Sequence, residues 1–435
     1  MISKSATHLL RERIKSALQR HPTQGQLWVG FSGGLDSTVL LHLLALSGIP
    51  VRVVHVHHGL SNNADRWLCH CEAFARELQV PFMAVRVLVD RGDGGVEQGA
   101  RRARYKAFDS VMSSGDQILL GHHGDDQAET FLQRLMRGAG VLGLAGMSES
   151  RDLGEGKSLL RPLLSAGRSD LEAWAVAHGL SWIEDESNTD ESLERNYLRR
   201  RVMPLLSARW PARQSIQRAA DNLREASQLL EELALADLQA CGVRPERFGE
   251  SLLLSAFCDL STARRKNLLR SWVLRQGGMT PESMALQEAM AQIGSASVDA
   301  QMEVRLGGRV VRRFQRRLYL TPGLESFTGT DTVLQWDGVS ALALTRGGVL
   351  EPAPGWPLKA YRVSYRRGGE RTQPRDRDRS QTLKKILQER ALEPWLRDRV
   401  PLIYLGGELV AVAGLFCCKA GDATLIEPPG WRFYD

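Results

Sequence analysis

The sequence predicts an α/β domain with a doubly wound parallel sheet, followed by a mainly helical middle domain and a small α+β C-terminal domain. Three observations support this fold class. Between Gln26 and Arg137, short apolar runs alternate with amphipathic stretches, which is typical of βαβ units. A long amphipathic stretch at 214–238 then leads into further segments with helical spacing. The end of the chain mixes short apolar runs with glycine-rich basic loops.

The first part contains candidate strands separated by candidate helices. The strands fall at 27–31, 51–56, 82–88 and 117–120. The helices fall at 37–46, 63–78 and 97–112, each after a loop rich in Gly, Ser, Asn or Asp. Doubly wound sheets bind ligands at the carboxyl ends of their strands. The site is therefore expected just after Phe31, Val56 and Leu120.

The later parts carry weaker signals. The helix at 214–238 keeps its apolar residues to one stripe and reads as a connector. Further helices and short strands follow at 262–275, 281–293, 302–306, 310–314 and 318–320. A looser stretch at 323–355, rich in Gly and Pro, precedes the last module. The expected domains are 1–212, catalytic; 213–325, middle; and 326–435, C-terminal.

Composition places the chain among ordinary globular proteins. Its 435 residues are 43% hydrophobic and 25% charged. The six cysteines are scattered, so no disulfide framework is expected, and a reducing cytoplasm is the simplest location. The N-terminus mixes charges too densely for a signal peptide, and no run approaches the ~20 apolar residues of a membrane span. The formal charge of +7 suits a polyanionic partner without establishing one.

The first candidate site is Ser32-Gly33-Gly34-Leu35-Asp36-Ser37, where a buried strand ends and a helix begins. Two glycines let the backbone turn with its N–H groups inward, the serine hydroxyls add donors, and the helix N-terminus adds partial positive charge. These features predict a pyrophosphate cradle, although a strand–turn–helix corner with an ordinary cap has the same outline. No lysine follows the glycines, so this is not a Walker loop, and Asp36 indicates Mg²⁺ beside the phosphates.

The second candidate site is His55-Val56-His57-His58-Gly59, at the end of the second strand. His57 is a candidate for contact with the adenine or a phosphate. Histidines are also common in polar loops at strand ends, and only geometry separates the two interpretations.

The third candidate site is the segment 121–130, Gly-His-His-Gly-Asp-Asp-Gln-Ala-Glu-Thr. If a helix begins near Asp125, Asp126 and Glu129 stand three residues apart on one face. Paired carboxylates suit a metal ion or a substrate ammonium group, and the alternative is a helix N-terminus whose acids favour its dipole. The His-Glu-x-x-His spacing of zinc sites is absent.

Arg101 lies near the start of the helix predicted at 97–112, which begins close to the same sheet edge. A guanidinium there could clamp a phosphate through two hydrogen bonds, and an exposed salt bridge is the alternative.

These segments carry two resemblances to known families. The loop 32–37 matches the signature loop of the N-type ATP pyrophosphatases, or PP-loop enzymes, which adenylate a substrate and release pyrophosphate. The ordered motifs through Pro204 resemble those of the tRNA(Ile)-lysidine synthases. Besides the sites above, the matching segments are Arg161-Pro-Leu-Leu, Trp182-Ile-Glu-Asp-Glu-Ser-Asn, Arg195-Asn196-Tyr197 and Arg199-Arg200-Arg201. Such a run of motifs is far more specific than any one of them.

The C-terminal module is rich in basic residues, at Arg366, Arg367, Arg371, Arg375, Arg377, Lys384 and Lys385. Such a patch can follow a phosphate backbone without reading bases, and the alternative is a solvated loop. The pattern Arg-Arg-Gly-Gly-Glu-Arg, followed by Leu-Lys-Lys and Pro394-Trp395, resembles the C-terminal domain of the longer lysidine synthases.

The resemblance implies a reaction on tRNA(Ile) with the anticodon CAU. ATP adenylates the oxygen on carbon 2 of the first anticodon cytidine, pyrophosphate leaves, and the side-chain amine of free L-lysine displaces AMP. The loop 32–37 and His57 are then expected to bind ATP. Asp126 and Glu129 are expected to bind lysine, and Asp36 and Asp126 are expected to bind Mg²⁺. The expected catalytic residues are Asp36, Arg101, His122, Asp126 and Glu129, with His122 as a proton acceptor. The expected tRNA contacts are Arg195, Asn196, Arg199 and the basic C-terminal residues.

Other classes of protein stay open at this point. A tRNA thiolase generally uses paired cysteines or an iron–sulfur cluster, and this sequence has no Cys-x-x-Cys. A small-molecule amidotransferase or NAD synthetase would not explain the basic module. A non-catalytic tRNA-binding protein would leave Asp36, Asp126 and Glu129 without a purpose. The sequence also leaves a homodimer open.

Overall fold

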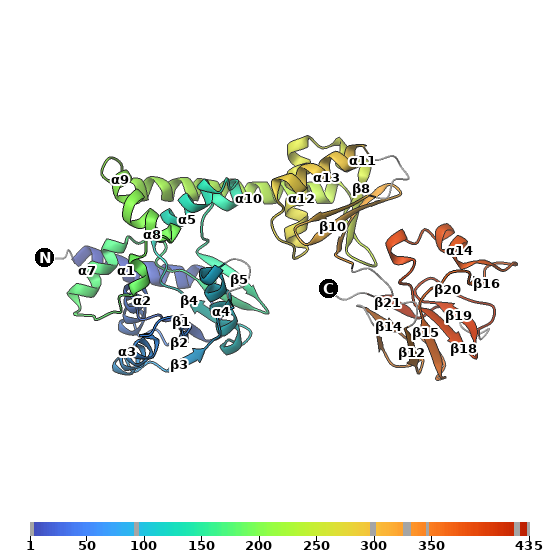
Figure 1. Cartoon of the computed structure of the whole chain (residues 1–435), viewed down its shortest axis with the longest axis horizontal. Coiled ribbons are helices and arrows are strands. Elements are labelled where there is room, and N and C mark those ends of the chain that lie inside the picture. Colours follow the sequence, from blue (N-terminus) through green and yellow to red (C-terminus); the bar gives the residue numbers. More distant parts are fainter. Residues whose placement is uncertain are drawn as a thin grey trace. The chain divides into compact units, whose positions relative to one another are not determined.

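The computed structural model describes residues 4–90, 95–295, 302–324, 332–344, 348–421 and 427–432. The chain divides into two compact units, Met1–Gln228 and Leu229–Asp435 (Figure 1). The finer division into three domains stays a prediction.

The first unit is built on a six-stranded sheet in the order β3-β2-β1-β4-β6-β5. Its strands are β1 (Leu27–Gly30), β2 (Arg52–His57), β3 (Phe82–Arg86), β4 (Gln117–Leu119), β5 (Ser150–Gly154) and β6 (Lys157–Leu160). All neighbours are parallel except β5, which pairs antiparallel with β6 in a hairpin. The strand order reverses between β1 and β4, so the ligand crevice of a doubly wound sheet falls there. The predicted fold class is confirmed.

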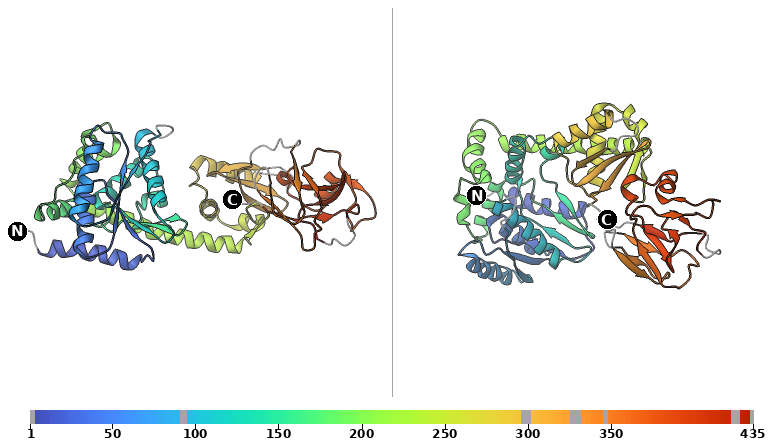
Figure 2. Two further views of the ribbon diagram at one scale, coloured as in Figure 1. Left: turned by 90° about the horizontal axis from the view of Figure 1, so that it is seen from below. Right: turned by 45° about the vertical axis from the view of Figure 1, so that its right-hand side comes forward.

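Helices cover both faces of this sheet (Figure 2). One face is covered by α1 (Lys4–Arg20), α2 (Leu35–Leu46), α3 (Ala64–Glu77) and α7 (Arg168–Ala177). The other face is covered by α4 (Gly95–Val111), through Phe108 and through Met112 just past the end of the helix. Helix α2 is apolar along nearly its whole length, because it is enclosed between the sheet, α1 and α7. The N-terminus of α2 is thereby held at the end of β1.

The first unit contains further helical segments, two of which lie between β4 and β5 while the others follow α7. These are α5 (Gly124–Met136), α6 (Val141–Leu144), a 3₁₀ turn (Glu186–Thr189), α8 (Glu194–Tyr197), a π-helical turn (Leu198–Val202) and α9 (Met203–Ser207). The long helix α10 (Ala212–Ala240) begins in this unit and ends in the next. It confirms the helix predicted at 214–238.

The second unit contains the predicted helical region and two larger antiparallel sheets. Its helices are α11 (Leu254–Asp259), α12 (Thr262–Arg275), α13 (Ser283–Ser295) and α14 (Leu383–Glu389), with a 3₁₀ turn at Pro394–Leu396. Helices α12 and α13 pack against a sheet in the order β7-β8-β11-β10-β9. Those strands are β7 (Arg244–Pro245), β8 (Glu250–Leu253), β9 (Glu303–Leu306), β10 (Arg309–Phe314) and β11 (Arg317–Pro322).

The C-terminal part has a core of its own around a sheet in the order β12-β15-β18-β19-β20. Its strands are β12 (Val333–Trp336), β15 (Tyr361–Ser364), β18 (Leu402–Leu405), β19 (Glu408–Val412) and β20 (Phe416–Cys417). Smaller ladders are formed by β13 (Leu342–Ala343), β14 (Val349–Glu351) and β21 (Gly430–Arg432), and by β16 (Arg371–Thr372) with β17 (Gln381–Thr382). In the part of the chain that the structure describes, no helix combines the length and the apolar content of a membrane span.

Candidate active site

The loop between β1 and α2 is shaped by Gly33. Its φ of +82° lies in the left-handed region, which suits glycine. A Cβ atom there would lie 2.4 Å from Cδ1 of Ile183 and 2.7 Å from Sγ of Cys71. Neither the backbone conformation nor the space admits a side chain. The tight turn predicted from the two glycines therefore depends on Gly33 in particular.

The hydroxyl groups of this loop are tied to each other. Ser37 Oγ donates to the Gly34 carbonyl at 3.0 Å and accepts from the Ser32 backbone N–H at 3.3 Å, and the two serine Oγ atoms are 3.2 Å apart. The first-turn N–H groups of α2 have no partner within the helix. The Leu35 side chain is buried in the core, so only its backbone can meet a ligand. Backbone N–H groups and hydroxyls together form an anion site.

The segment after β4 lies directly against this loop. A Cβ atom on Gly121 would lie 2.8 Å from the carbonyl atoms of Asp36, so the two backbones can approach only because position 121 is glycine. Next along the chain, His123 caps α5: its Nδ1 accepts from the backbone N–H groups of Asp125 at 3.2 Å and Asp126 at 3.4 Å. Asp126 Oδ2 in turn accepts from the His123 backbone N–H at 3.0 Å. This reciprocal cap fixes where Asp126 stands.

His123 lies between the two carboxylates that the sequence indicated for Mg²⁺. Its side chain is fully buried, and Nε2 is 3.5 Å from Asp36 Oδ1 and 3.5 Å from Asp126 Oδ2. Burial acts to lower the pKa of His123, but Asp36 and Asp126 outweigh it and the pKa is raised. The backbone N–H groups of Asp125 and Asp126 donate to the lone pair of Nδ1, and this opposes protonation of that nitrogen. In the neutral and the charged ring alike, Nε2 carries a hydrogen directed at the two carboxylates.

His122 was the predicted proton acceptor, and no role was predicted for His123. His122 is half-buried, its Nδ1 is without a partner among the described residues, and burial lowers its pKa to about 4. It is therefore a neutral but weak base near pH 7. The overlooked signal was the position of His123 three residues before Asp126, the spacing of a capping box. The role of His122 as proton acceptor stays a prediction.

Asp126 and Glu129 do lie together, as predicted, and two arginines join them. Arg195 donates from Nη2 to Asp126 at 2.5 Å and from Nε to Glu129 at 2.7 Å. Arg199 donates to both oxygens of Glu129, at 2.6 and 2.9 Å. Glu129 is 2% exposed. Burial acts to raise the pKa of Asp126, but His123 and Arg195 outweigh it and hold the pKa at about 2. The four residues form a charge-balanced cluster beside the phosphate loop.

Asn196 holds the chain that carries these arginines. Its side-chain amide donates to the carbonyls of Ser187 at 2.8 Å and Asp190 at 2.9 Å. Residues 195 and 199 are one helical turn apart, so both guanidinium groups reach the same side. The tRNA contacts predicted for Arg195, Asn196 and Arg199 stay predictions, while the contacts described above are to the cluster and the loop 187–190.

Two other predicted site residues have partners outside the cluster. His57 is buried, and its Nε2 lies 3.2 Å from Asp65, which also pairs with Arg86 at 2.7 Å. Arg101 is exposed on α4, with its guanidinium carbon 5.2 Å from the centre of the Tyr105 ring. Their predicted roles toward ATP stay predictions.

Asp36 fits Mg²⁺ better than Asp126 does. Oδ1 of Asp36 is buried and has no hydrogen-bond partner among the described residues. Both oxygens of Asp126 are engaged, one by Arg195 and the other by the His123 backbone. Within the described ranges, no group of three or more His, Cys, Asp or Glu is placed to hold a metal ion. Any Mg²⁺ here would depend on phosphates and water for most of its ligands.

Replacing His123 with Asn should separate its two contacts. Asn is a favoured N-cap residue and can accept from the α5 backbone, but it has no donor at the position of Nε2. We expect His123→Asn to melt near the parent temperature and to adenylate about 5-fold more slowly, since the loss of the 3.5 Å contact between Nε2 and the Asp36 carboxylate should cost about 1 kcal/mol. Pyrophosphate release and thermal unfolding measure the two effects. His123→Gln, which places a donor farther out, should recover part of the rate; equal rates for Asn and the parent would exclude a role for Nε2.

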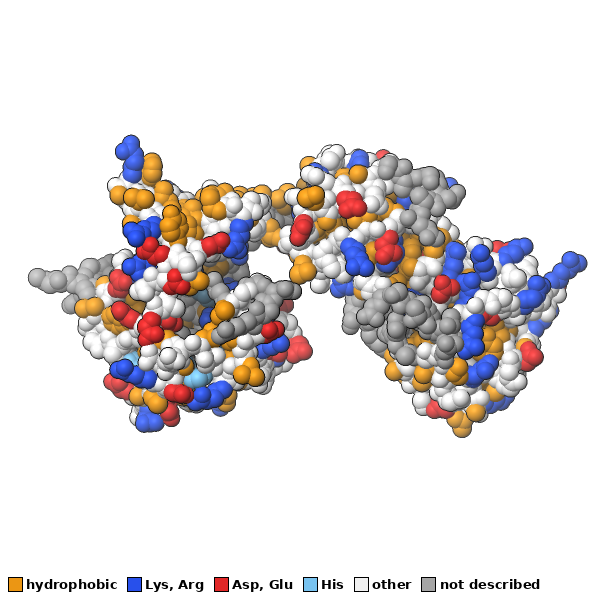
Figure 3. All heavy atoms as spheres, viewed as in Figure 1, with side chains coloured by type: hydrophobic (Ala, Val, Ile, Leu, Met, Phe, Trp, Pro, Cys, Tyr) orange, Lys and Arg blue, Asp and Glu red, His pale blue; other side chains and the backbone are white. Residues whose placement is uncertain are grey.

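The basic residues of the C-terminal part divide into two groups. Arg366 pairs with Asp398 at 3.1 Å, Arg375 donates to the Cys418 carbonyl at 3.3 Å, and Arg377 binds Gln381 at 2.9 Å and also Glu389. These side chains support the module itself. Arg367, Arg371, Lys384 and Lys385 are exposed. Figure 3 shows basic side chains gathered over the region of β16 and α14.

A doubly wound sheet whose first strand is followed by Ser-Gly-Gly-Leu-Asp-Ser at a helix N-terminus defines a PP-loop protein. The sequence model of the family described as "PP-loop domain" matches residues 6–206. The "TilS substrate binding domain" matches residues 252–319 and the "TilS substrate C-terminal domain" residues 361–432. The tRNA(Ile)-lysidine synthase of Shigella flexneri is 40% identical over 92% of this chain and 94% of its own length. The tRNA(Ile)-lysidine synthase of Pseudomonas fluorescens is 43% identical over 93% of this chain and 92% of its own length. The chain belongs to the tRNA(Ile)-lysidine synthase family.

Proposed function

We propose that this protein ligates L-lysine to carbon 2 of the first anticodon cytidine of the CAU-anticodon tRNA(Ile). ATP first adenylates the base and releases pyrophosphate, and lysine then displaces AMP. The product pairs with A instead of G, so decoding changes from AUG to AUA. The observation that carries the proposal is the buried cluster of Asp126 and Glu129 with Arg195 and Arg199, placed beside a phosphate loop.

The adenylation step is assigned to the β1–α2 loop. Backbone N–H groups from Gly33 to Ser37, with the hydroxyls of Ser32 and Ser37, would hold the phosphates of ATP. Asp36 would hold Mg²⁺, whose charge offsets the charge that develops as pyrophosphate leaves. His123 would keep the Asp36 carboxylate in place.

The lysine step is assigned to the four-residue cluster. A free amino acid carries an α-ammonium and an α-carboxylate, and the cluster contains carboxylates and guanidinium groups in equal number. Asp126 and Glu129 would take the ammonium, and Arg195 or Arg199 would take the carboxylate through a paired hydrogen bond. The side-chain amine would then attack carbon 2 of the adenylated base, AMP would leave with the oxygen, and the amine would lose a proton.

The direct test combines purified protein, ATP, labelled lysine and a set of tRNAs. We expect label to enter only the CAU-anticodon isoleucine tRNA, with one pyrophosphate and one AMP formed for each lysine attached. Pyrophosphate release without label in the tRNA would leave a PP-loop enzyme with a different second substrate.

The exposed basic residues provide a prediction for tRNA binding. Arg371, Lys384 and Lys385 are exposed, although Arg371 also donates to the Ser380 carbonyl at 3.2 Å and Lys385 lies 3.9 Å from Glu389. Replacing all three with Ala should lower the slope of log affinity against log salt by up to about three units, since each lost phosphate contact lowers it by about one. Filter binding at several salt concentrations measures the slope. Arg377→Ala is the matched control. We expect it to lower the melting temperature and to change the salt slope little, because Arg377 binds Gln381 and Glu389 within the module.

A further inference from the structure

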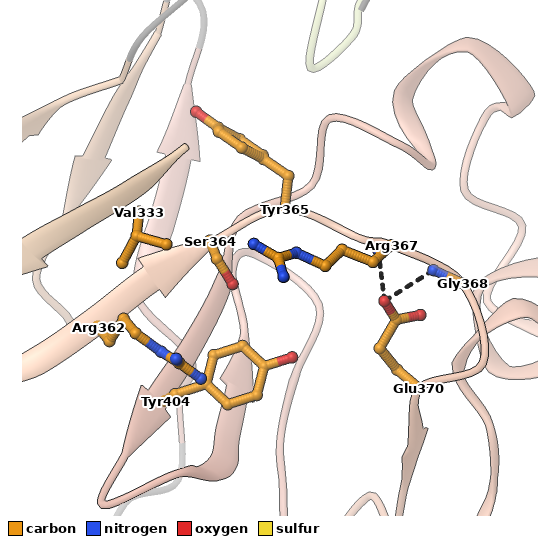
Figure 4. A pocket seen from close by; sticks show the side chains of 8 residues that line it. All are labelled: Val333, Arg362, Ser364, Tyr365, Arg367, Gly368, Glu370 and Tyr404. Atoms are coloured by element: carbon orange, nitrogen blue, oxygen red, sulfur yellow. Dashed lines mark hydrogen bonds between the residues drawn. The ribbon is translucent and has the colours of Figure 1, made fainter. Parts of the chain in front are cut away.

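A pocket of ≈ 340 Å³ lies on one face of the C-terminal sheet (Figure 4). Val333 of β12 pairs with Ser364 of β15, and Arg362 of β15 pairs with Tyr404 of β18. Cross-strand partners point to the same face, as do residues two apart in one strand. These four side chains therefore lie on the same face and form the floor of the pocket.

The loop 366–370 forms one wall of the pocket. Gly368 and Gly369 have φ values of +97° and +84°, so the loop turns sharply beside the sheet. Glu370 Oε1 accepts from the backbone N–H groups of Arg367 and, at 2.9 Å, Gly368. Oε1 is therefore committed to holding the loop, while Oε2 has no hydrogen-bond partner among the described residues and lies 3.9 Å from Nε of Arg366. Figure 4 shows the Arg367 side chain extending from the loop on the side of Ser364.

The floor offers a flat, positively charged surface. The guanidinium carbon of Arg362 lies 4.9 Å from the centre of the Tyr404 ring, which is the distance of a cation–π contact. Burial and the nearby Glu370 raise the pKa of Tyr404, although Arg362 and Arg367 act in the opposite direction. Tyr404 therefore stays a neutral phenol near pH 7, with both guanidinium groups close enough to influence it.

We propose that this pocket binds an unpaired nucleotide of the tRNA, with the base against the Arg362–Tyr404 pair and the phosphate toward Arg367. The inference rests on the proposed function in one respect, that the substrate is a tRNA.

The shape of the pocket favours an unpaired nucleotide over a duplex backbone. Paired RNA is bound mostly through phosphates and riboses on its outer surface, for which open arginines and lysines such as Arg371 and Lys384 suffice. An unstacked base instead needs a concave site with a planar surface, and aromatic rings and guanidinium planes are the surfaces on which such bases stack. Tyr404 and Arg362 provide both kinds of plane.

The test uses the full-length protein and intact tRNA without ATP or lysine. Tyr404→Leu keeps an apolar side chain but removes the ring, and we expect it to weaken tRNA binding about 5- to 150-fold with an unchanged salt slope. Tyr404→Phe keeps the ring and should bind like the parent. Arg362 is exposed, so Arg362→Ala should fold normally and weaken binding in the same direction. It keeps the test decisive if Tyr404→Leu is unstable.

Chemical footprinting at single-nucleotide resolution identifies the occupant. The parent should protect one unpaired nucleotide other than the modified cytidine, and Tyr404→Leu should leave that nucleotide reactive. Parent-like affinity and footprint in Tyr404→Leu and Arg362→Ala would overturn the proposal, and so would a reduced salt slope with no loss of protection, which indicates a duplex backbone. Binding of AMP that depends on Tyr404 while tRNA binding does not would make this a free-nucleotide site. Failure of lysine transfer alone would count only against the proposed function.

Discussion

Asp36→Ala should abolish pyrophosphate release in the presence of ATP, lysine and tRNA. The buried Oδ1 of Asp36 has no protein hydrogen-bond partner among the described residues, and it stands at the N-terminus of α2, where the phosphates are expected. Without this carboxylate the phosphates would lose the metal that offsets their charge, in a site where water screens little. Such charge stabilisation contributes several kcal/mol, so the rate should fall by at least about 10³-fold. Single-turnover pyrophosphate release measures it.

Two further variants show whether this loss is specific. Asp36→Asn keeps the size of the side chain and should be nearly as inactive, because the charge is what binds the metal. Asp152→Ala removes a carboxylate from the exposed β5 hairpin of the same sheet and should adenylate at the parent rate. Adenylation by Asp36→Ala within about tenfold of the parent would refute the role given to Asp36.

Glu129→Gln should separate the two chemical steps. If Glu129 binds the incoming lysine and does not bind ATP, the variant should still adenylate the tRNA and release pyrophosphate. It should need much more lysine to finish, so the adenylated tRNA should accumulate. A charge-assisted hydrogen bond contributes about 1.5–3 kcal/mol, which corresponds to a rise in the lysine requirement of roughly 10- to 150-fold. The lysine and ATP dependence of each step, measured separately, gives the result.

The arginines make a matched control necessary for this prediction. Glu129 holds Arg195 and Arg199, so its loss also leaves two guanidinium groups with fewer partners. Glu149→Gln breaks another carboxylate–arginine pair of the same unit, with Arg20 at 2.6 Å, and should leave the lysine requirement unchanged. Asp126→Asn should impair both steps, because Asp126 also contacts His123. Equal impairment of both steps in Glu129→Gln, with no change in lysine dependence, would place the amine elsewhere.

Much of the fold could be predicted because periodicity and loop chemistry agree along the chain. The helix at 262–275 and the strand at 117–120 match α12 (Thr262–Arg275) and β4 (Gln117–Leu119) closely. Helix α1, the β5–β6 hairpin and α7 were not predicted. The segment 4–20 carries polar residues on most of its surface, and only Leu10, Ile14 and Ala17 are deeply buried among its described side chains. Such a sparse stripe is identified as a helix only once its partner is known.

The site was predicted in part. The phosphate loop and the pairing of Asp126 with Glu129 follow from local spacing, because residues three apart on a helix share a face. The contacts of these carboxylates with Arg195 and Arg199 join segments 66 to 70 residues apart. No local pattern reports such a contact, and the arginines were expected to contact tRNA because their segments resemble motifs of the lysidine synthases. His123 caps α5 through Nδ1 and approaches Asp36 and Asp126 through Nε2. This double role also could not be predicted without the three-dimensional structure.

The ion pairs between Asp126, Glu129, Arg195 and Arg199 also bear on how the site responds to its surroundings. The charges of these two carboxylates and two guanidinium groups sum to zero. An amino acid whose α-ammonium and α-carboxylate replace these internal partners exchanges ion pairs for ion pairs. Only the side-chain ammonium of lysine then adds a charge, so lysine capture should depend far less on ionic strength than tRNA capture does. A change in ionic strength would therefore alter the binding of tRNA far more than the binding of lysine.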